Sequence, residues 1–239
     1  MATESNEAGA KFLPLPQRCI FDDTDLKCFM ESPTKVELMN FVEAMGKSCA
    51  STEGLVDDHD YSISSHSFEN IPPSMACLHG SLQEMVSWVD DFPPVSSNTA
   101  AGIRFGNPAF RSWHARLVER SGAIITTILQ ARDDDGHLTV ELACQRGKDS
   151  AAGVLNPNGG DRSVRQVSLY LQKSFGDSAR LDYGTGHESF FAIFLLILSK
   201  VKCFGEPPFS MVTLRAVTLS IFDQYLKVTR RYVPLRREP

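Results

Sequence analysis

The stretch RLDYGTGHESF, residues 180–190, gathers residue types that can bind a phosphate. Free backbone N–H groups and the dipole at the amino end of a helix attract anions, and a helix that begins near Thr185 would supply both. Glycine has no side chain, so Gly184 and Gly186 would let a ligand approach the backbone closely. Arg180 lies shortly before them and could bind a phosphate through two hydrogen bonds. This stretch is therefore a candidate phosphate-binding loop.

The same residues have a second interpretation that needs no ligand. The segment 185–188, TGHE, matches the S/T-x-x-E capping box. In that motif the Thr185 side chain caps the first helical turn and the Glu188 side chain reaches back to the Thr185 amide. The sequence holds neither a Walker lysine nor a strand-linked GxGxxG motif to decide between the two. The residues alone leave both interpretations open and favour the capping box.

Other site chemistries have little support in the sequence. Aligning the acidic stretch around Gly136 with a calcium loop puts Ala131 and Leu142 at two positions that need oxygen ligands. His187 lacks the partner histidine of a zinc protease motif, since Phe191 stands one helical turn later. The cysteines show no CxxC pair and no metal-ligand spacing; they are residues 19, 28, 49, 77, 144 and 203. We expect no bound metal at these positions, and the sequence identifies no catalytic residue.

The composition predicts a single globular domain without a membrane or nucleic-acid partner. With 239 residues and 42% hydrophobic content, the chain can bury a sizeable core. A formal charge of -5 argues against nucleic-acid binding, which needs a basic surface. The apolar run 190–198 is far shorter than the ~18–20 residues that cross a bilayer, so it predicts a core helix. The polar amino terminus has no pattern of a secretion signal, and we expect the protein in the cytoplasm, with the nucleus as a second compartment.

Every strongly periodic segment is helical, which predicts an all-α fold. Ser32 as the cap and Pro33 at the first position predict a helix to residue 49. Its apolar residues at helical spacing are Val36, Met39, Phe41, Val42 and Met45. Besides the helix that contains the run 190–198, further helices are predicted at 75–92, 105–132, 163–175 and 211–231. Trp88, Phe110 and Trp113 are expected to be core or interface aromatics.

Asn107 and Arg111 stand where the helix 105–132 begins. Asn107 is a candidate N-cap, with Pro108 at the first helical position. A loop asparagine and an arginine just inside a helix can also fix a neighbouring loop by hydrogen bonds. The simpler interpretation is a cap together with a surface salt bridge, and both stay open.

The chain divides into a leader, a helical domain and a tail. Residues 1–17 are polar with spaced prolines and predict a disordered leader. The helical domain spans 18–231. Within it, the segment 131–162 is acidic and rich in Gly and Asn, which predicts an inserted surface loop whose only possible strand is HLTVELAC, 137–144. Residues 232–239 form a divergent tail.

Three segments together resemble the phosphotyrosyl phosphatase activator family, the activators of serine/threonine protein phosphatase 2A. They are RFGNPAFRSWHARL (104–117), SFGDSARLDYGTGHESFFAIFL (174–195) and IFDQYLKVTRR (221–231). The resemblance implies an all-helical fold with lobes around a cleft that binds ATP, at positions that correspond to Arg180, Thr185 and Gly186. It also implies contact with the catalytic subunit of protein phosphatase 2A and with the scaffold-bound core enzyme. A chaperone role and a peptidyl-prolyl cis-trans isomerase activity on a proline-containing segment are implied as well.

The chain departs from the family pattern after Arg231. The family continues with a glycine-rich stretch, EPAGSxGVWGLDD, whose acidic residues help to hold magnesium, whereas this sequence ends in YVPLRREP. We therefore expect a domain truncated at its carboxyl end, without the magnesium motif. An exposed apolar face is expected on the last helix, formed by Val212, Ile221, Phe222 and Leu226. The alternatives to an ATP-assisted activator are a non-enzymatic module that binds the phosphatase and an unrelated helical scaffold.

Overall fold

The computed structural model describes residues 16–50, 71–95, 107–132 and 162–232. Over these residues the chain forms helices and turns, and one isolated bridge joins Asp177 to Asp182. The elements in chain order are α1 (Asp23–Met30), α2 (Pro33–Ala50), α3 (Pro73–Asp91), α4 (Ala109–Arg132), α6 (Arg162–Ser174), α7 (Thr185–Lys200), α8 (Met211–Ala216), the π-helix η2 (Val217–Phe222) and α9 (Asp223–Tyr232). The all-α prediction is confirmed for this part of the chain.

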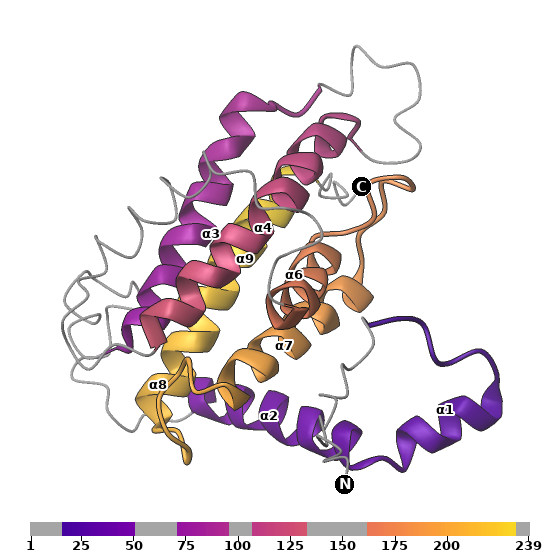
Figure 1. Cartoon of the computed structure of the whole chain (residues 1–239), viewed down its shortest axis with the longest axis vertical. Coiled ribbons are helices and arrows are strands. Elements are labelled where there is room, and N and C mark those ends of the chain that lie inside the picture. The colour runs from indigo at the N-terminus through magenta and orange to yellow at the C-terminus, as the bar shows by residue number, and fades with distance from the viewer. Residues whose placement is uncertain (1–15, 51–70, 96–106, 133–161, 233–239) are drawn as a thin grey trace, which may run out of the picture.

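The helices pack around one core, and α1 projects from it (Figure 1). α3 contacts both α4 and α9, and the three lie side by side. α6 packs against α4 and also against α7. α2 lies across one end of this bundle, where it contacts α7 and α8. α1 contacts α2 and buries none of its side chains.

Aromatic rings from different helices meet in the core. Trp113 of α4 is fully buried, and its indole N–H donates a hydrogen bond of 3.0 Å to a backbone carbonyl of α3. Trp88 and Phe110 pack against Trp113 and are buried too. Phe191 of α7 stacks on Tyr225 of α9, with ring centroids 4.0 Å apart. The prediction that the two tryptophans and Phe110 are core aromatics is confirmed.

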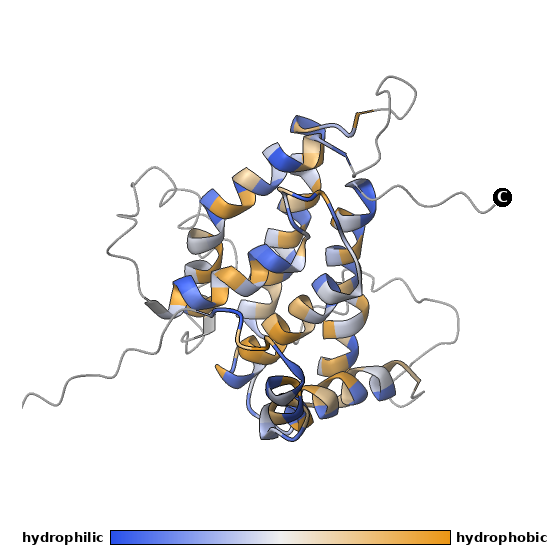
Figure 2. Cartoon of the chain, turned by 90° about the vertical axis from the view of Figure 1, so that its right-hand side faces the viewer, coloured by the Kyte–Doolittle hydropathy of each residue, from blue (hydrophilic) through white to orange (hydrophobic). Residues whose placement is uncertain are grey.

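The start of α2 follows the sequence prediction, but its apolar stripe does so only in part. The Ser32 hydroxyl accepts a hydrogen bond of 3.2 Å from the amide of residue 35, and the helix begins at Pro33. Most helices alternate apolar and polar sides (Figure 2). On α2 the residues Phe41 and Met45 are buried, whereas the rest of the stripe is about half exposed, at Val36, Met39 and Val42. Periodicity identifies the apolar side of a helix, but tertiary contacts decide how much of it is covered.

The helix predicted over 211–231 is divided by a π-helical segment. The chain passes from α8 through η2 into α9, and the three together end at residue 232. A π-helical turn bonds each residue to one farther along than in an α-helix, so it changes which side chains face the core. Such turns occur often at functional sites.

The expected exposed apolar face of this helix is wrong for most of its members. Ile221 is fully buried, and Phe222 and Leu226 are partly buried against the core. Only Val212, of the four, is mostly exposed. Phe222 packs against Phe191 of α7, and α2, α3 and α9 pack on η2.

Some predicted segments fall outside the described residues. These are nearly all of the leader, the tail from residue 233, and the insert apart from its two ends, which belong to α4 and α6. The possible strand 137–144 and most of the calcium alignment lie there as well. Among the helices that the structure describes, none is long and apolar enough to cross a membrane.

Candidate functional site

The loop between α6 and α7, residues 175–184, is closed on itself by hydrogen bonds. The Asp177 amide donates to the Asp182 carbonyl at 3.2 Å, and the Leu181 amide donates to the Asp177 carbonyl at 2.7 Å. The Asp177 carboxylate also accepts from two amides inside the loop, at 2.9 and 3.0 Å. The loop is thus held in one shape by its own polar groups, and its position depends on how its ends are fixed.

Gly176 makes the sharp turn at the start of this loop. Its φ angle is +120°, in a region that side chains rarely adopt. A Cβ atom at this position would lie 2.8 Å from the Asp182 carbonyl oxygen. Both facts make glycine necessary here.

The carboxylate of Asp177 is stabilised in its charged form. The hydrogen bond from the Arg180 amide lowers the pKa of Asp177, and the Ala179 amide and the charges of Lys173 and Arg180 act in the same direction. Hydrogen bonds to a carboxylate favour its ionised form, so Asp177 is negative at neutral pH.

Arg180 projects into solvent from the same loop. Its side chain is 69% exposed, and its Nε atom lies 3.1 Å from the Asp182 carboxylate and 4.0 Å from that of Asp177. Exposed ion pairs are weak, typically below ~1 kcal/mol, so a phosphate could replace Asp182 as the partner of Arg180. The sequence predicts Arg180 as a phosphate ligand, and it gives no indication of this competing pair.

The capping box predicted at 185–188 is wrong. α7 begins at Thr185 itself, and the cap position is taken by Gly184, which has extended backbone and no side chain that could accept a hydrogen bond from the first amides. Glycine is an acceptable N-cap because it adopts extended backbone at little cost. Within the described residues, the amides of Thr185 and Gly186 have no hydrogen-bond acceptor. The amino end of α7 is therefore free to receive one from a ligand.

The Glu188 carboxylate contacts the Tyr183 hydroxyl and does not reach back to the Thr185 amide. The Tyr183 hydroxyl lies 3.3 Å from the Glu188 carboxylate and 2.7 Å from the Tyr225 hydroxyl. Tyr225 in turn donates its single proton to the Ser174 carbonyl at 2.7 Å. The proton between the two tyrosines must then come from Tyr183, so Tyr225 and Glu188 compete for it, and the shorter bond to Tyr225 is the stronger.

Both tyrosines are held in the neutral form. Burial raises the pKa of Tyr225 far above its ordinary value. Burial also raises the pKa of Tyr183. The pair therefore acts as a neutral hydrogen-bond network at physiological pH.

A small cavity of about 20 Å³ lies beneath the loop, large enough for about one water molecule. Its lining residues come from all three segments that carry the family resemblance. The first segment supplies Asn107 and Phe110, the second Phe175, Leu181, Asp182 and Tyr183, and the third Val228 and Thr229, with Tyr232 following directly. These segments lie far apart in the sequence, and the fold brings them to one place.

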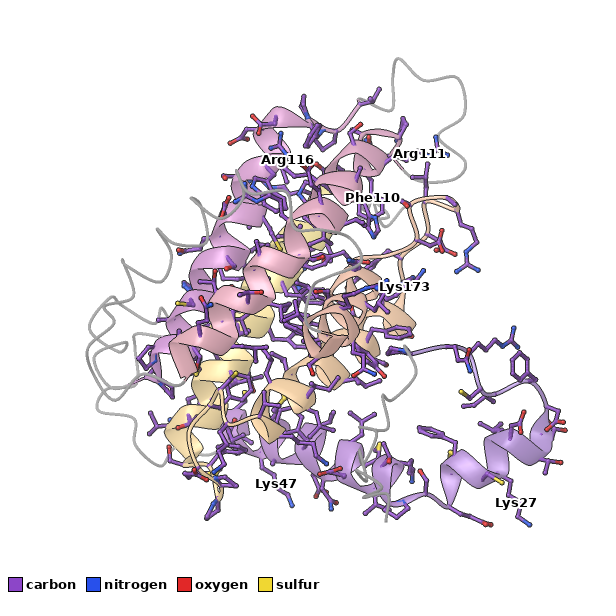
Figure 3. All side chains as sticks on the ribbon, viewed as in Figure 1. Lys27, Lys47, Phe110, Arg111, Arg116 and Lys173 are labelled. Carbon is purple, nitrogen blue, oxygen red and sulfur yellow. The ribbon has the colours of Figure 1, made fainter. Side chains whose placement is uncertain are left out.

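Asn107 and Arg111 each form hydrogen bonds to a neighbouring non-helical segment, as one of the two interpretations predicts. The Asn107 side chain accepts from the amide of Val95 at 3.1 Å and donates to the carbonyl of the same residue at 2.9 Å. It also accepts from the amide of Ala109 at 3.1 Å, so the cap is present as well. Arg111 lies at the start of α4 beside the loop (Figure 3), and its Nε donates to the Ser178 carbonyl at 3.2 Å.

Sequence reasoning missed two polar residues of the site, Tyr225 and Thr229. Both are buried on α9, in a segment whose apolar spacing predicts only its inward side. A buried tyrosine usually finds a hydrogen-bond partner for its hydroxyl, so the Tyr225 hydroxyl was a usable indication. Its partners Ser174 and Tyr183 follow only from the packing of α9 on the end of α6.

The described residues fit a phosphate group better than they fit a whole nucleotide. Thr185 and Gly186 offer free amides at a helix amino end, and Arg180 is exposed nearby in the sequence. A cavity of about 20 Å³ does not enclose an adenosine. Within the part of the chain that the structure describes, no group of three or more His, Cys, Asp or Glu side chains is placed to hold a metal ion.

The all-helical fold is similar to that of a solved phosphatase activator. The crystal structure of the PP2A phosphatase activator Ypa1 superposes with a TM-score of 0.58 and 25% sequence identity, covering 91% of this chain and 55% of that chain. Residues 16–234 match the family model described as phosphotyrosyl phosphate activator (PTPA) protein. The chain belongs to this family, and the alternative of an unrelated helical scaffold is wrong.

Curated relatives carry matching names. The chain is 27% identical over 222 residues to the probable serine/threonine-protein phosphatase 2A activator 2 of Dictyostelium discoideum, covering 91% of this chain and 38% of the relative. It is 29% identical over 216 residues to the serine/threonine-protein phosphatase 2A activator 2 of Neurospora crassa, covering 90% and 38%. The chain therefore spans less than half the length of these two relatives.

Proposed function

We propose that this chain activates serine/threonine protein phosphatase 2A by binding its catalytic subunit, free or in the scaffold-bound core enzyme. Family membership over residues 16–234 and the names of the relatives support this function. The observation that carries the proposal is the convergence of three distant segments, all of which carry the family resemblance, on one cavity beside the loop 175–184. We also propose that the protein acts as a chaperone of that subunit. We place it in the cytoplasm and the nucleus, and cell fractionation would test this localisation.

We propose further that the amino end of α7 receives the phosphates of ATP. The amides of Thr185 and Gly186 would donate to phosphate oxygens, and Arg180 would exchange its exposed pair with Asp182 for a phosphate. Bound ATP would supply the negative charge that draws Arg180 away from Asp182. The ionised Asp177 would repel a phosphate, and the family resemblance implies a magnesium ion that would offset this repulsion, although its binding motif is absent from this sequence.

The family's peptidyl-prolyl cis-trans isomerase activity is also part of the proposal. Rotation about a peptide bond faces a barrier of ~18–20 kcal/mol. An apolar surface that desolvates the amide, or a donor to the prolyl nitrogen, lowers such a barrier. Phe110 and Val228 would supply apolar neighbours, and the Tyr183 hydroxyl would have to leave Tyr225 before it could donate to a prolyl nitrogen. The proline-containing segment would belong to the phosphatase.

The test combines a phosphatase assay with a matched pair of variants. The purified chain is added to the phosphatase 2A catalytic subunit, and release of phosphate from a phosphopeptide is measured with and without ATP and magnesium. We expect stimulation that Arg180→Ala weakens and Arg165→Ala leaves unchanged, because Arg165 is an exposed arginine on α6 away from the loop. Absence of stimulation by the wild-type chain, together with failure to co-purify with the phosphatase, would reject the function.

A second candidate is a non-enzymatic module that binds the phosphatase without ATP. The pairing of Arg180 with Asp182 and the small cavity favour it, because both leave little room for a nucleotide in the described arrangement. Calorimetric titration with ATP, with and without magnesium, separates the two candidates. Binding of the phosphatase without any measurable ATP affinity would support the non-enzymatic module.

A further inference from the structure

The carboxyl end of α6 is closed by side chains from three other helices. The last carbonyls of a helix have no partner within it, and a buried helix end must find donors elsewhere. Gln172, Lys173 and Ser174 supply these carbonyls, and Ser174 is fully buried. Their donors are His114 Nε2 of α4 at 3.2 Å, His187 Nδ1 of α7 at 2.6 Å and the Tyr225 hydroxyl of α9 at 2.7 Å.

These bonds fix the protonation of the two imidazoles. A carbonyl oxygen can only accept a hydrogen bond, so the nitrogen that faces it must carry a proton. His114 is therefore protonated at Nε2, and His187 at Nδ1. Each side chain serves as a donor of defined geometry, which an amide side chain of matching length can imitate.

His187 joins both ends of the loop. Its Nδ1 binds the Lys173 carbonyl before the loop. Its ring stacks on Tyr183 at the end of the loop, with centroids 5.8 Å apart and planes 18° apart. Its Nε2 lies 3.8 Å from the Asp182 carboxylate. One imidazole near the start of α7 thus contacts the chain on either side of the self-closed segment 176–182.

We propose that His187 is the positioning residue of the loop 175–184, with His114 and Tyr225 securing the helix end from which the loop starts. Because the loop keeps its own shape through Asp177, its placement is set by its outside contacts. Arg111 holds the Ser178 carbonyl inside the loop, and His187 contacts both loop ends. The imidazole sets where Arg180 and Tyr183 lie relative to the amino end of α7. This role rests on the proposed function for its biological use, but the positioning itself does not.

A direct role for His187 in binding or catalysis fits the geometry less well. Its side chain is only 16% exposed, and one ring face is stacked on Tyr183. Nδ1 is occupied by the Lys173 carbonyl, and Nε2 faces Asp182. Neither nitrogen is open to a ligand in this arrangement, so the residue acts through the loop.

The test compares His187→Ala with His187→Asn. Asparagine places its amide N–H close to where Nδ1 stands, so it keeps the bond to the Lys173 carbonyl, whereas alanine removes it. Ser199→Ala is the control on the same helix, because its hydroxyl bonds only locally to the Leu196 carbonyl. Hydrogen exchange of the loop amides, measured on the full chain without ligand, reports positioning directly. Thermal unfolding reports whether each variant folds.

We expect exchange of the Asp177 and Leu181 amides to rise about tenfold in His187→Ala and to return to within about threefold of wild type in His187→Asn. Exchange in the rest of α7 should stay unchanged in both. Unchanged loop exchange in His187→Ala, or equal exchange in the two variants, would overturn the proposal. Should His187→Ala fail to fold, His114→Gln and His114→Ala give the same comparison, since glutamine imitates Nε2.

The phosphatase assay then separates this proposal from the proposed function. Suppose that loop exchange follows the expected order, that the wild-type chain stimulates the phosphatase and that His187→Ala does not. This result supports both the positioning role and the proposed function. The same order of exchange with no stimulation by any variant supports the positioning role and rejects the proposed function. Normal stimulation by His187→Ala despite a loosened loop would overturn the statement that positioning serves that function.

Discussion

The Tyr225 hydroxyl donates a hydrogen bond of 2.7 Å to the Ser174 carbonyl, 51 residues earlier in the chain. This contact ties α9 to the end of α6, directly before the loop that carries Arg180. Tyr225 also accepts a hydrogen bond from Tyr183 and stacks on Phe191. One side chain therefore connects the core, the helix end and the rim of the candidate site.

Removing this hydroxyl should destabilise the fold. Tyr225→Phe keeps the stacked ring but leaves the buried Ser174 carbonyl and the Tyr183 hydroxyl short of a partner. We expect the free energy of unfolding to fall by ~1–3 kcal/mol, as measured by urea denaturation followed by circular dichroism. Tyr170→Phe is the control, because the Tyr170 hydroxyl has no hydrogen bond within the described residues. Equal stabilities of the two variants would contradict the assignment.

Thr185 should matter little for stability because it does not cap α7. Thr185→Ala is expected to change the free energy of unfolding by less than ~0.5 kcal/mol. Ser32→Ala, in contrast, removes the side chain that caps α2 and should lower it by ~0.5–2 kcal/mol. The same urea titrations compare them. A loss of ~1 kcal/mol in Thr185→Ala would restore the capping box that the structure excludes.

Two glycines should respond to alanine in opposite directions. Gly176→Ala forces a side chain into a φ of +120° and within 2.8 Å of a carbonyl oxygen, so we expect a loss of ~1–3 kcal/mol or more. Gly46 lies inside α2, where an added Cβ would meet nothing within 4 Å. Gly46→Ala should therefore raise the free energy of unfolding by ~0.5–1 kcal/mol. Thermal unfolding of both variants is the measurement, and a tolerated Gly176→Ala would argue against the described loop.

Stability should decline in mildly acidic solution. Burial lowers the pKa of His114, and burial followed by the charge of Lys227 lowers the pKa of His79. A histidine in the unfolded chain has a pKa of about 6.5, so below that pH the unfolded chain binds protons that the folded chain does not. The contribution of the two neutral histidines to the free energy of unfolding is therefore complete above about pH 6.5. It is lost as the pH falls toward their lowered pKa values, by at most ~1.4 kcal/mol per pH unit for each histidine.

The variant His114→Gln isolates one of these two contributions. Glutamine keeps a donor for the Gln172 carbonyl but has no proton to gain in this range. We expect the slope of the free energy of unfolding against pH, between about pH 5 and 6.5, to decrease relative to wild type. His79→Gln gives the second contribution independently. An unchanged slope in His114→Gln would show that His114 is not kept neutral by the fold.

The sequence was a good guide wherever the interactions are local. The cap at Ser32, the helical start near Asn107 and the apolar run in α7 each depend on residues within one or two turns. It was a poor guide at Thr185, because the helix begins one residue earlier than the capping box requires and Gly184, with extended backbone, takes the cap position. The exposed face expected around Ile221 failed similarly, because η2 turns that residue toward the core.

The sequence by itself determined the helical class, the family and the identity of the loop that carries Arg180, since these follow from short-range patterns and a distinctive motif. Only the tertiary structure decided what that loop touches. The contacts of His187 with Lys173, of Arg111 with Ser178 and of Tyr225 with Ser174 join different helices, and their partners depend on how those helices pack. Helical periodicity predicts which residues face inward, but the pairing of polar groups across helices is fixed by packing geometry, which no local pattern encodes.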